Sequence, residues 1–278
     1  MREVSLPCGS TIPAIGQGTW HMGEPGGDHA AEADALRLGL DLGMRLIDTA
    51  EMYADGGSEQ VVGGAIAGRR DEVFLVSKLY PQNASTAGMR AACEHSLRRL
   101  GTDRLDLYLL HWRGSVPLAE TVAAFEELRA EGKILRWGVS NLDVDDMEEL
   151  LAVPGAHRCV TDQVLYNLEY RGVEFDLLPW CETRHLPVMA YSPVGQGGRL
   201  LKHTALRDVA SAHGATSAQV ALAWALRHPH VIAIPKASQP AHVRANAAAA
   251  MIMLTAEDMA ALDLAFPPPR KRRALDML

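Results

Sequence analysis

The 278-residue chain has only four cysteines and no long hydrophobic run. Cys8, Cys93, Cys159 and Cys181 are widely spaced and form no C-x-x-C pair, so they do not indicate a disulfide framework. We expect them to be small buried residues in a reducing compartment. The N-terminal MREVSLPCGS lacks an apolar stretch of signal-peptide length, and no run of about 20 apolar residues follows. The sequence therefore predicts neither a secretory signal nor a membrane span, and we expect a cytoplasmic protein.

Positive charge and aromatic side chains are also scarce. Lys and Arg total 27 against 34 Asp and Glu, which leaves a net charge of −7. A mildly acidic chain lacks the electrostatic field of a general nucleic-acid binder, so we expect no nucleic-acid partner. The basic run at 270–273 follows three prolines and is expected to be a solvated tail over the end of the fold. The aromatics comprise only five Trp, six Tyr and four Phe, so their placement carries information.

No Pro-, Ser- or Gly-rich linker is long enough to separate two domains. Hydrophobic residues make up 48% of the chain and charged residues 22%, as in ordinary globular proteins. We therefore predict one domain over residues 1–278.

The chain alternates between short apolar segments and segments of helical periodicity. The expected strands are 15–20, 46–50, 73–79, 105–112, 135–141, 159–166, 187–193 and 231–236. The expected helices are 30–42, 59–67, 87–100, 118–130, 144–151, 175–184, 218–227 and 241–250. Gly43, Gly68, Gly101 and Gly132 follow four of these helices, where a left-handed cap is favoured.

Eight such strand–helix units in about 250 residues predict an α/β fold, the (β/α)8 TIM barrel. A β-hairpin at 3–12 is expected to cover the barrel floor, and an extra helix is expected at 255–266. Thr255 can cap that helix, with Asp258 at the capping-box spacing.

The main alternative fold is an open doubly wound sheet with a dinucleotide loop of the pattern G-x-G-x-x-G after its first strand. The corresponding stretch, GQGTWH at 16–21, has His21 where the third glycine belongs. A bulky side chain at that position argues against such a phosphate loop.

Ionisable side chains lie near the carboxyl ends of three successive expected strands. Asp48 lies near the end of the second strand, Lys78 near the end of the third and His111 near the end of the fourth, and Tyr53 lies just beyond the second strand. In a barrel these ends meet on the face where active sites lie. Burying Asp48 and Lys78 there is costly unless they pair, so we expect an ion pair between them.

This set can transfer a proton. A tyrosine beside a lysine cation is expected to have a lowered pKa, which would allow Tyr53 to protonate a developing alkoxide near neutral pH. His111 can hydrogen-bond the same oxygen and orient a carbonyl.

The sequence resembles the aldo-keto reductase superfamily along almost its whole length. The motifs that carry the resemblance are GQGTW (16–20), LIDTAEMYADGGSE (46–59), VFLVSK (73–78), LDLYLLHW (105–112), WGVSN (137–141), DQVLYN (162–167), YSPVGQGG (191–198) and IPKAS (234–238). The resemblance implies a (β/α)8 barrel and an NAD(P)H-dependent oxidoreductase acting on CH–OH or carbonyl groups. It places the family's catalytic tetrad on Asp48, Tyr53, Lys78 and His111, with none of the four replaced.

The resemblance also implies the residues that contact the cofactor. Ser140, Asn141 and Gln163 would bind the nicotinamide carboxamide, and Tyr191 would stack on the ring. The other implied cofactor contacts are Thr19, Trp20, Asp48, Ser192, Pro193, Val194, Gln196, Lys236, Ala237, Ser238, Arg244 and Asn246.

The adenosine end departs from the family's NADPH-selective pattern. Lys236 matches the lysine that reaches the 2′-phosphate, but His242 stands where an Arg is usual, with Arg244 two positions further. The usual Glu-Asn pair at the adenine is Ala245-Asn246. Because Lys236 is retained, NADPH is the expected cofactor, with NADH as the alternative.

The implied substrate pocket consists of Trp20, Tyr53, Tyr80, His111 and Trp112. Only residues 267–278 remain where larger members of the family have a long closing loop, so an open pocket for small carbonyls is expected. The loop sequences are most similar to a bacterial branch that reduces methylglyoxal and other small aldehydes.

A second hypothesis is a nicotinamide-binding regulatory module without significant turnover. A third, metal-dependent hydrolysis, would need clustered His and Asp ligands at several strand ends, and only His111 and Asp48 qualify. We therefore predict no metal. Many members of the family act as monomers, and we expect the same here.

Overall fold

The computed structural model describes residues 2–278, which form a barrel of eight parallel strands. The strands are β3 (Gln17–Gly18), β4 (Leu46–Asp48), β5 (Phe74–Leu79), β6 (Leu107–Leu110), β7 (Trp137–Ser140), β8 (Cys159–Leu165), β9 (Val188–Tyr191) and β10 (Val231–Ala233). They pair in chain order, and parallel bridges from Ile15 to Ala233 and from Gly18 to Lys236 join the first strand to the last. This closure confirms the predicted barrel and excludes the open doubly wound sheet.

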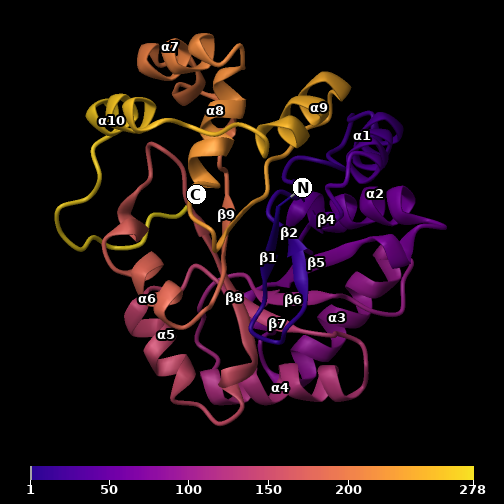
Figure 1. Ribbon diagram of the computed structural model, residues 1–278. Coiled ribbons are helices and arrows are strands. Elements are labelled where there is room, and N and C mark those ends of the chain that lie inside the picture. The colour runs from indigo at the N-terminus through magenta and orange to yellow at the C-terminus, as the bar shows by residue number, and fades with distance from the viewer. Residues whose placement is uncertain (1) are drawn as a thin grey trace.

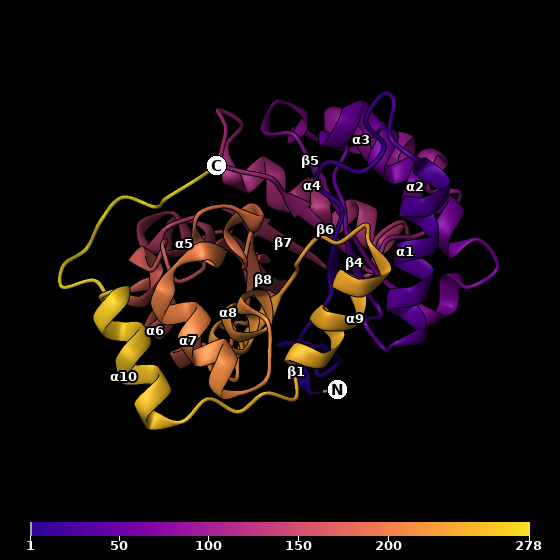
Figure 2. The ribbon, with the colours of Figure 1, turned by 90° about the horizontal axis from the view of Figure 1, so that it is seen from above.

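The helices form a ring around the strands, with α1 to α6 following one another around it (Figure 1; Figure 2). They are α1 (His29–Asp41), α2 (Gly57–Ile66), α3 (Thr86–Leu100), α4 (Leu118–Ala130), α5 (Val144–Leu151), α6 (Leu177–Thr183), α7 (Thr204–Ala212), α8 (Ser217–Ala225), α9 (Pro240–Ala249) and α10 (Ala256–Ala265). The pattern of one helix per strand did not predict α7. It buries Leu206, Val209 and Ala210 at helical spacing.

Local capping explains where several helices begin and end. Gly43, Gly68, Gly101 and Gly132 all have positive φ, from 63° to 90°, as the sequence predicted. At the start of α10, Thr255 and Asp258 form the expected reciprocal capping box.

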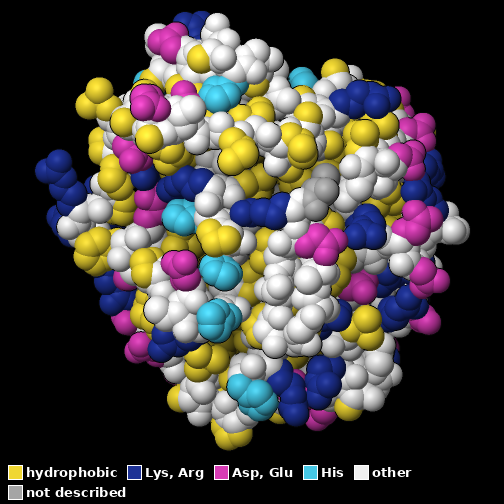
Figure 3. Space-filling view, in the orientation of Figure 1, with side chains coloured by type: hydrophobic (Ala, Val, Ile, Leu, Met, Phe, Trp, Pro, Cys, Tyr) yellow, Lys and Arg dark blue, Asp and Glu magenta, His cyan; other side chains and the backbone are white. Residues whose placement is uncertain are grey.

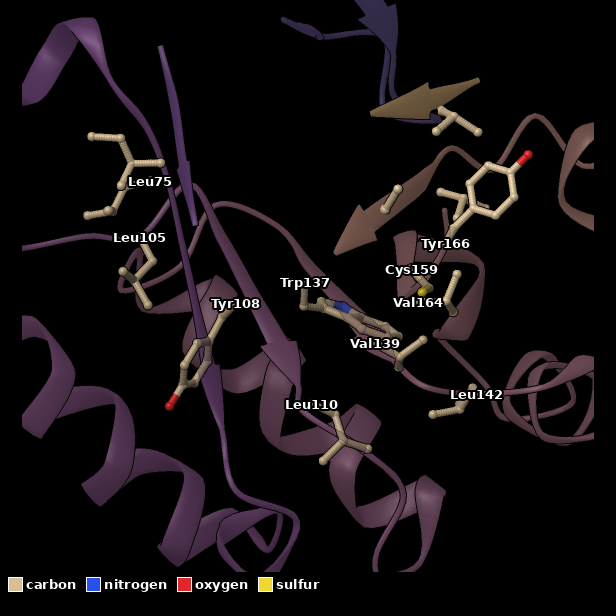
Figure 4. Close-up of a cluster of buried hydrophobic side chains, with 14 of the residues drawn as sticks. Leu75, Leu105, Tyr108, Leu110, Trp137, Val139, Leu142, Cys159, Val164 and Tyr166 are labelled. Carbon is tan, nitrogen blue, oxygen red and sulfur yellow. The ribbon is translucent and has the colours of Figure 1, made fainter. Parts of the chain in front are cut away.

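One hydrophobic cluster fills the layer between the strands and the helices. Figure 4 shows side chains of this layer, among them Tyr108 of β6 and Trp137 of β7. The ring of Phe125, from α4, stacks on Trp137 with centroids 5.1 Å apart. Such packing holds each helix against the barrel and so fixes the ends of the strands.

A second cluster fills the barrel interior and includes the N-terminal hairpin of β1 (Glu3–Ser5) and β2 (Thr11–Pro13). Val4 and Ile12 of the hairpin are buried there. Arg2 donates to the carbonyl of Val231 at 3.2 Å, and Glu3 pairs with Arg45 just before β4. Because Val231 and Arg45 lie where strands begin, the hairpin covers the floor as predicted, and Figure 1 shows it across the centre of the ring.

The expectation that all four cysteines are buried is wrong for Cys8. Cys93, Cys159 and Cys181 are buried and unpaired, whereas Cys8 is exposed at the hairpin turn. A tight turn that projects from the floor has no layer above it to bury the thiol.

The tail after α10 is mostly exposed but is tied to the barrel. Arg272 forms ion pairs with Asp145 at 2.9 Å and with Asp176 at 3.0 Å. These contacts attach the tail to the N-terminal ends of α5 and α6.

Within residues 2–278, no helix is both long enough and apolar enough to cross a membrane. On the face drawn in Figure 3, basic and acidic side chains are intermixed.

Candidate active site

The carboxyl ends of β4, β5 and β6 bring three of the predicted residues together. Asp48 is the last residue of β4, Lys78 lies in β5, and His111 follows β6. The three strands are adjacent and in parallel register. Tyr53 begins a 3₁₀ turn, Tyr53–Gly56, just beyond β4. Residues far apart in the chain thus converge because parallel strands end at one face.

Lys78 is fully buried and makes three polar contacts. Its ammonium donates to Asp48 Oδ2 at 2.7 Å, to the Thr49 carbonyl at 2.9 Å and to the Tyr53 hydroxyl at 3.0 Å. The predicted ion pair with Asp48 is therefore confirmed. Burial alone would lower the pKa of Lys78, but the negative charge of Asp48 and the hydrogen bonds to Asp48 and to the Tyr53 hydroxyl outweigh burial and raise it. Lys78 is a cation at neutral pH.

The prediction that the pKa of Tyr53 is lowered overall is wrong, although the Lys78 cation does act in that direction. Burial raises the pKa of Tyr53 above its ordinary value, and the opposing effect of Lys78 does not overcome it. Asp48 adds to the rise. The phenol is therefore protonated at neutral pH, which is the form that can donate a proton.

The turn after Tyr53 has an unusual backbone. Ala54 and Asp55 have φ of 50° and 53°, in the left-handed region that side chains disfavour. Beyond this turn, the buried Glu59 accepts from Ser77 and from Arg99, each at 2.6 Å. The hydrogen bond from Ser77 anchors α2 to β5 and the ion pair with Arg99 anchors it to α3, which holds the turn in place. Glu59 belongs to the motif at 46–59, but no local pattern there predicts this role.

His111 is nearly enclosed. Burial, and then the nearby Lys78 cation, lower the pKa of His111 to about 2. The imidazole is therefore neutral at physiological pH. Its Nδ1 is buried and has no hydrogen-bond partner within residues 2–278.

Ser140, Asn141 and Gln163 lie together at the ends of β7 and β8. The Ser140 hydroxyl donates to the Gln163 carbonyl at 2.7 Å, and the Asn141 side chain donates to Ser140 Oγ at 3.1 Å. The Tyr191 hydroxyl donates to Asn141 Oδ1 at 3.1 Å. Gln163 Nε2 also donates to Asp48 Oδ1 at 2.8 Å, a link that the sequence analysis did not predict. The predicted carboxamide site and the tetrad are thus one hydrogen-bonded unit.

The loop after β9 carries Ser192, Pro193, Val194 and Gln196. Ser192 and Gln196 both have positive φ, 47° and 55°. The fully buried Asn167 donates to the Ser192 carbonyl at 2.9 Å and fastens this loop to β8. Asn167 belongs to the motif at 162–167, but no local pattern there predicts this role.

The residues predicted for the adenosine end lie after β10 and on α9. Lys236 is exposed and approaches Ser238 Oγ at 3.5 Å. Ala237 is half-buried, Arg244 is exposed and Asn246 is buried. This end therefore presents two cations to solvent.

The predicted pocket aromatics line up beside the tetrad. The Trp20 ring meets Tyr53 edge-on with centroids 4.8 Å apart. The ring centroids of His111 and Trp112 are 4.9 Å apart, and those of Trp112 and Tyr80 are 6.0 Å apart. Trp20 is 40% exposed, so this aromatic row faces solvent at one end.

A cavity of about 440 Å³ lies elsewhere, between the β8–α6 loop and the tail. Arg171, Arg199 and Phe266 line it, and none of the predicted pocket residues does. Its volume therefore gives no measure of the space beside Tyr53.

Within the described residues, no group of three or more His, Cys, Asp or Glu side chains is arranged to hold a metal ion. The tetrad contributes only Asp48 and His111 to such a set.

Comparison with known proteins identifies relatives over nearly the full length. The aldo/keto reductase family model matches residues 14–265. Methylglyoxal reductase YeaE of Escherichia coli is 56% identical over 96% of both chains. Glyoxal reductase of Bacillus subtilis is 34% identical over 94% of this chain and 91% of its own.

Solved structures of aldo/keto reductases also match the fold of this chain over nearly its full length. An aldo/keto reductase from Klebsiella pneumoniae, in complex with NADP and acetate, is 55% identical with a TM-score of 0.97. That comparison covers 100% of this chain and 99% of the other. A structure from the same organism in complex with NADPH has a TM-score of 0.98 at 55% identity and the same coverage.

Proposed function

The chain belongs to the aldo/keto reductase family, and we propose that it reduces small aldehydes, 2-oxoaldehydes such as methylglyoxal, or ketones to alcohols with NADPH. The observation that carries the proposal is the position of Lys78, which contacts both Asp48 and the Tyr53 hydroxyl inside the barrel mouth. The likeness to a methylglyoxal reductase supports the 2-oxoaldehyde as the first substrate to test.

Tyr53 acts as the general acid in this proposal. Its hydroxyl lies 3.0 Å from Lys78 Nζ, and burial keeps it protonated. As negative charge develops on the substrate oxygen, Tyr53 donates its proton, and the Lys78 cation stabilises the phenolate that remains.

Asp48 and His111 support this proton transfer in different ways. Asp48 accepts from Lys78 and from Gln163, which fixes the ammonium under the Tyr53 hydroxyl. His111 is neutral, so an N–H of its ring can donate a hydrogen bond to the carbonyl oxygen without competing for its proton.

The residues present fit a nicotinamide dinucleotide. Ser140, Asn141 and Gln163 offer amide and hydroxyl groups at the strand ends, as a carboxamide requires. Lys236 and Arg244 supply exposed positive charge at a second place, suited to a phosphate. When bound, NADPH supplies the hydride that reduces the carbonyl carbon.

The test uses the purified protein with NADPH and a panel of small aldehydes, 2-oxoaldehydes and keto-sugars, followed by cofactor absorbance. We expect carbonyl-dependent oxidation of NADPH, with methylglyoxal among the substrates. Binding of NADPH without turnover of any carbonyl would contradict the proposal and favour the regulatory module.

The cofactor preference needs its own measurement. Comparison of kcat/KM for NADPH and NADH is expected to favour NADPH, because Lys236 is retained. A clear advantage for NADH would contradict this choice.

The remaining proposals concern the state of the protein in the cell. We propose a cytoplasmic monomer, in keeping with the free thiols Cys93, Cys159 and Cys181. Sedimentation of the purified chain tests the oligomeric state.

A further inference from the structure

The loop between β3 and α1 carries Trp20, whose ring lies edge-on against Tyr53 at 4.8 Å. Trp20 is 40% exposed, so packing encloses only part of its ring. The backbone contacts of its loop therefore help to set the distance between the Trp20 and Tyr53 rings.

Glu32 provides one such contact. It lies in the first turn of α1, is only 8% exposed, and accepts from the backbone N–H of Gly23 at 2.9 Å. The carboxylate is near the positive end of the helix dipole, where negative charge is favoured. Glu32 therefore connects the Trp20 loop to a helix that is packed on the barrel.

The second contact is between two backbones. Gly23 has φ of 75°, and a Cβ there would lie 2.3 Å from the carbonyl carbon of Gly57. Likewise, a Cβ on Gly57 would lie 2.5 Å from the Gly23 carbonyl oxygen. Only glycine fits this approach, so the Trp20 loop rests directly on the first residue of α2, just beyond the Tyr53 turn.

Hydroxyl groups extend the same junction inward. The fully buried Ser58 donates to Thr19 Oγ1 at 2.7 Å and lies 3.0 Å from the Thr49 hydroxyl. Thr19 in turn donates to the Asp48 carbonyl at 3.0 Å. The loop is thus bonded to the end of the strand that carries Asp48.

We infer that Glu32 is a positioning residue, which holds the Gly23–Gly57 contact closed and thereby sets the spacing of Trp20 from Tyr53 and the binding of the carbonyl substrate. This inference rests on the proposed function. Within residues 2–278, the Glu32 side chain has no hydrogen bond to the tetrad, and the bond to Gly23 is the one through which it acts on the loop.

The test compares Glu32→Ala with Glu32→Gln. Alanine leaves the Gly23 N–H without its acceptor, whereas glutamine keeps a carbonyl oxygen at the same place. Since one buried hydrogen bond is worth roughly a factor of ten, we expect KM for the aldehyde to rise about ten-fold in Glu32→Ala. The kcat should stay within about two-fold, and Glu32→Gln should restore the wild-type KM. The NADPH Kd should rise less than KM, because Trp20 is only one of the implied cofactor contacts. Asp34→Ala, which removes an exposed carboxylate from the same helix, is the matched control.

Hydrogen exchange supplies a readout independent of activity. The Gly23 amide should exchange about ten-fold faster in Glu32→Ala than in the wild type, and at the wild-type rate in Glu32→Gln. Should Glu32→Ala fail to fold, Gly23→Ala replaces it, because its Cβ pushes the loops apart while Glu32 stays.

The outcomes separate the two ideas. Absence of turnover in the wild type overturns the proposed function, and the exchange rates still decide whether Glu32 holds the loop. An active wild type with unchanged KM and exchange in Glu32→Ala overturns the inference. So does an equal loss of NADPH affinity and aldehyde affinity, which would show a general structural role.

Discussion

The two ends of the barrel differ in their buried side chains, which are apolar at the floor and polar at the mouth. At the floor, Val4 and Ile12 of the hairpin pack into the apolar interior cluster. At the mouth, Asp48, Lys78 and Tyr53 are equally buried but polar, and each has a partner. The same eight strands join the two ends, so the difference comes from the side chains at their termini.

The comparison shows how one scaffold separates stability from chemistry. Apolar burial at the floor lowers the free energy of the folded state without directed contacts. The mouth instead needs specific distances, since a buried charge without its partner is destabilising. We therefore expect substitutions at the floor to change stability alone, whereas substitutions at the mouth change activity even where they leave every buried charge paired.

The largest expected effect is at Tyr53. Tyr53→Phe removes the proton donor but leaves the ring, so kcat for aldehyde reduction should fall by about 10³-fold. NADPH affinity, measured by fluorescence titration, and the thermal unfolding midpoint should stay near wild type. Full activity in this variant would refute the assigned role.

The matching change at the floor is Ile12→Ala. Ile12 is 1% exposed, so its truncation should lower the free energy of unfolding by about 2–5 kcal/mol, as measured by denaturant titration. The kcat/KM of the folded enzyme should not change. Met253→Ala, at an 86% exposed position, is the control and should affect neither quantity. A loss of kcat/KM in Ile12→Ala would break the separation between floor and mouth.

A smaller effect is expected at the adenosine end. Lys236→Ala removes an exposed cation, and KM for NADPH should rise about ten-fold with kcat unchanged. Lys271→Ala removes another exposed cation, in the tail, and should leave KM for NADPH unchanged. Equal effects of the two substitutions would indicate only general electrostatic attraction.

The smallest expected change is with pH. The pKa of His111 is lowered to about 2 and that of Tyr53 is raised, so neither group titrates between about pH 6 and pH 9. The kcat for reduction should therefore vary less than about two-fold over this range. A fall in kcat on acidification with a midpoint near the ordinary histidine pKa would show that His111 becomes charged.

Much of the fold follows from local sequence. Helices 118–130 and 144–151 match α4 and α5 residue for residue, since their apolar spacing marks the buried face. The predicted strands are longer than the observed ones, as in 105–112 against Leu107–Leu110, because apolar composition does not show where the ladder ends. Two helices lie between β9 and β10, and the first of them, α7, was missed because one helix per strand was assumed.

The residues of the candidate site were predictable from the sequence, but the hydrogen bonds that connect them were not. The strand-end rule and the motifs brought forward Asp48, Lys78 and His111. The bond from Gln163 to Asp48 spans 115 residues and depends on how β8 and β4 face each other across the barrel. No local sequence pattern predicts a hydrogen bond between two residues so far apart in the chain.

By itself, the sequence determined the barrel class and which residues carry the chemistry, because alternation and strand-end motifs are local properties of the chain. The tertiary structure decided the protonation of Tyr53, because desolvation there outweighs the Lys78 charge. It also decided the exposure of Cys8 and the contact of Gly23 with Gly57. Burial and close approach arise between segments distant in the chain, so only the folded barrel sets their magnitude.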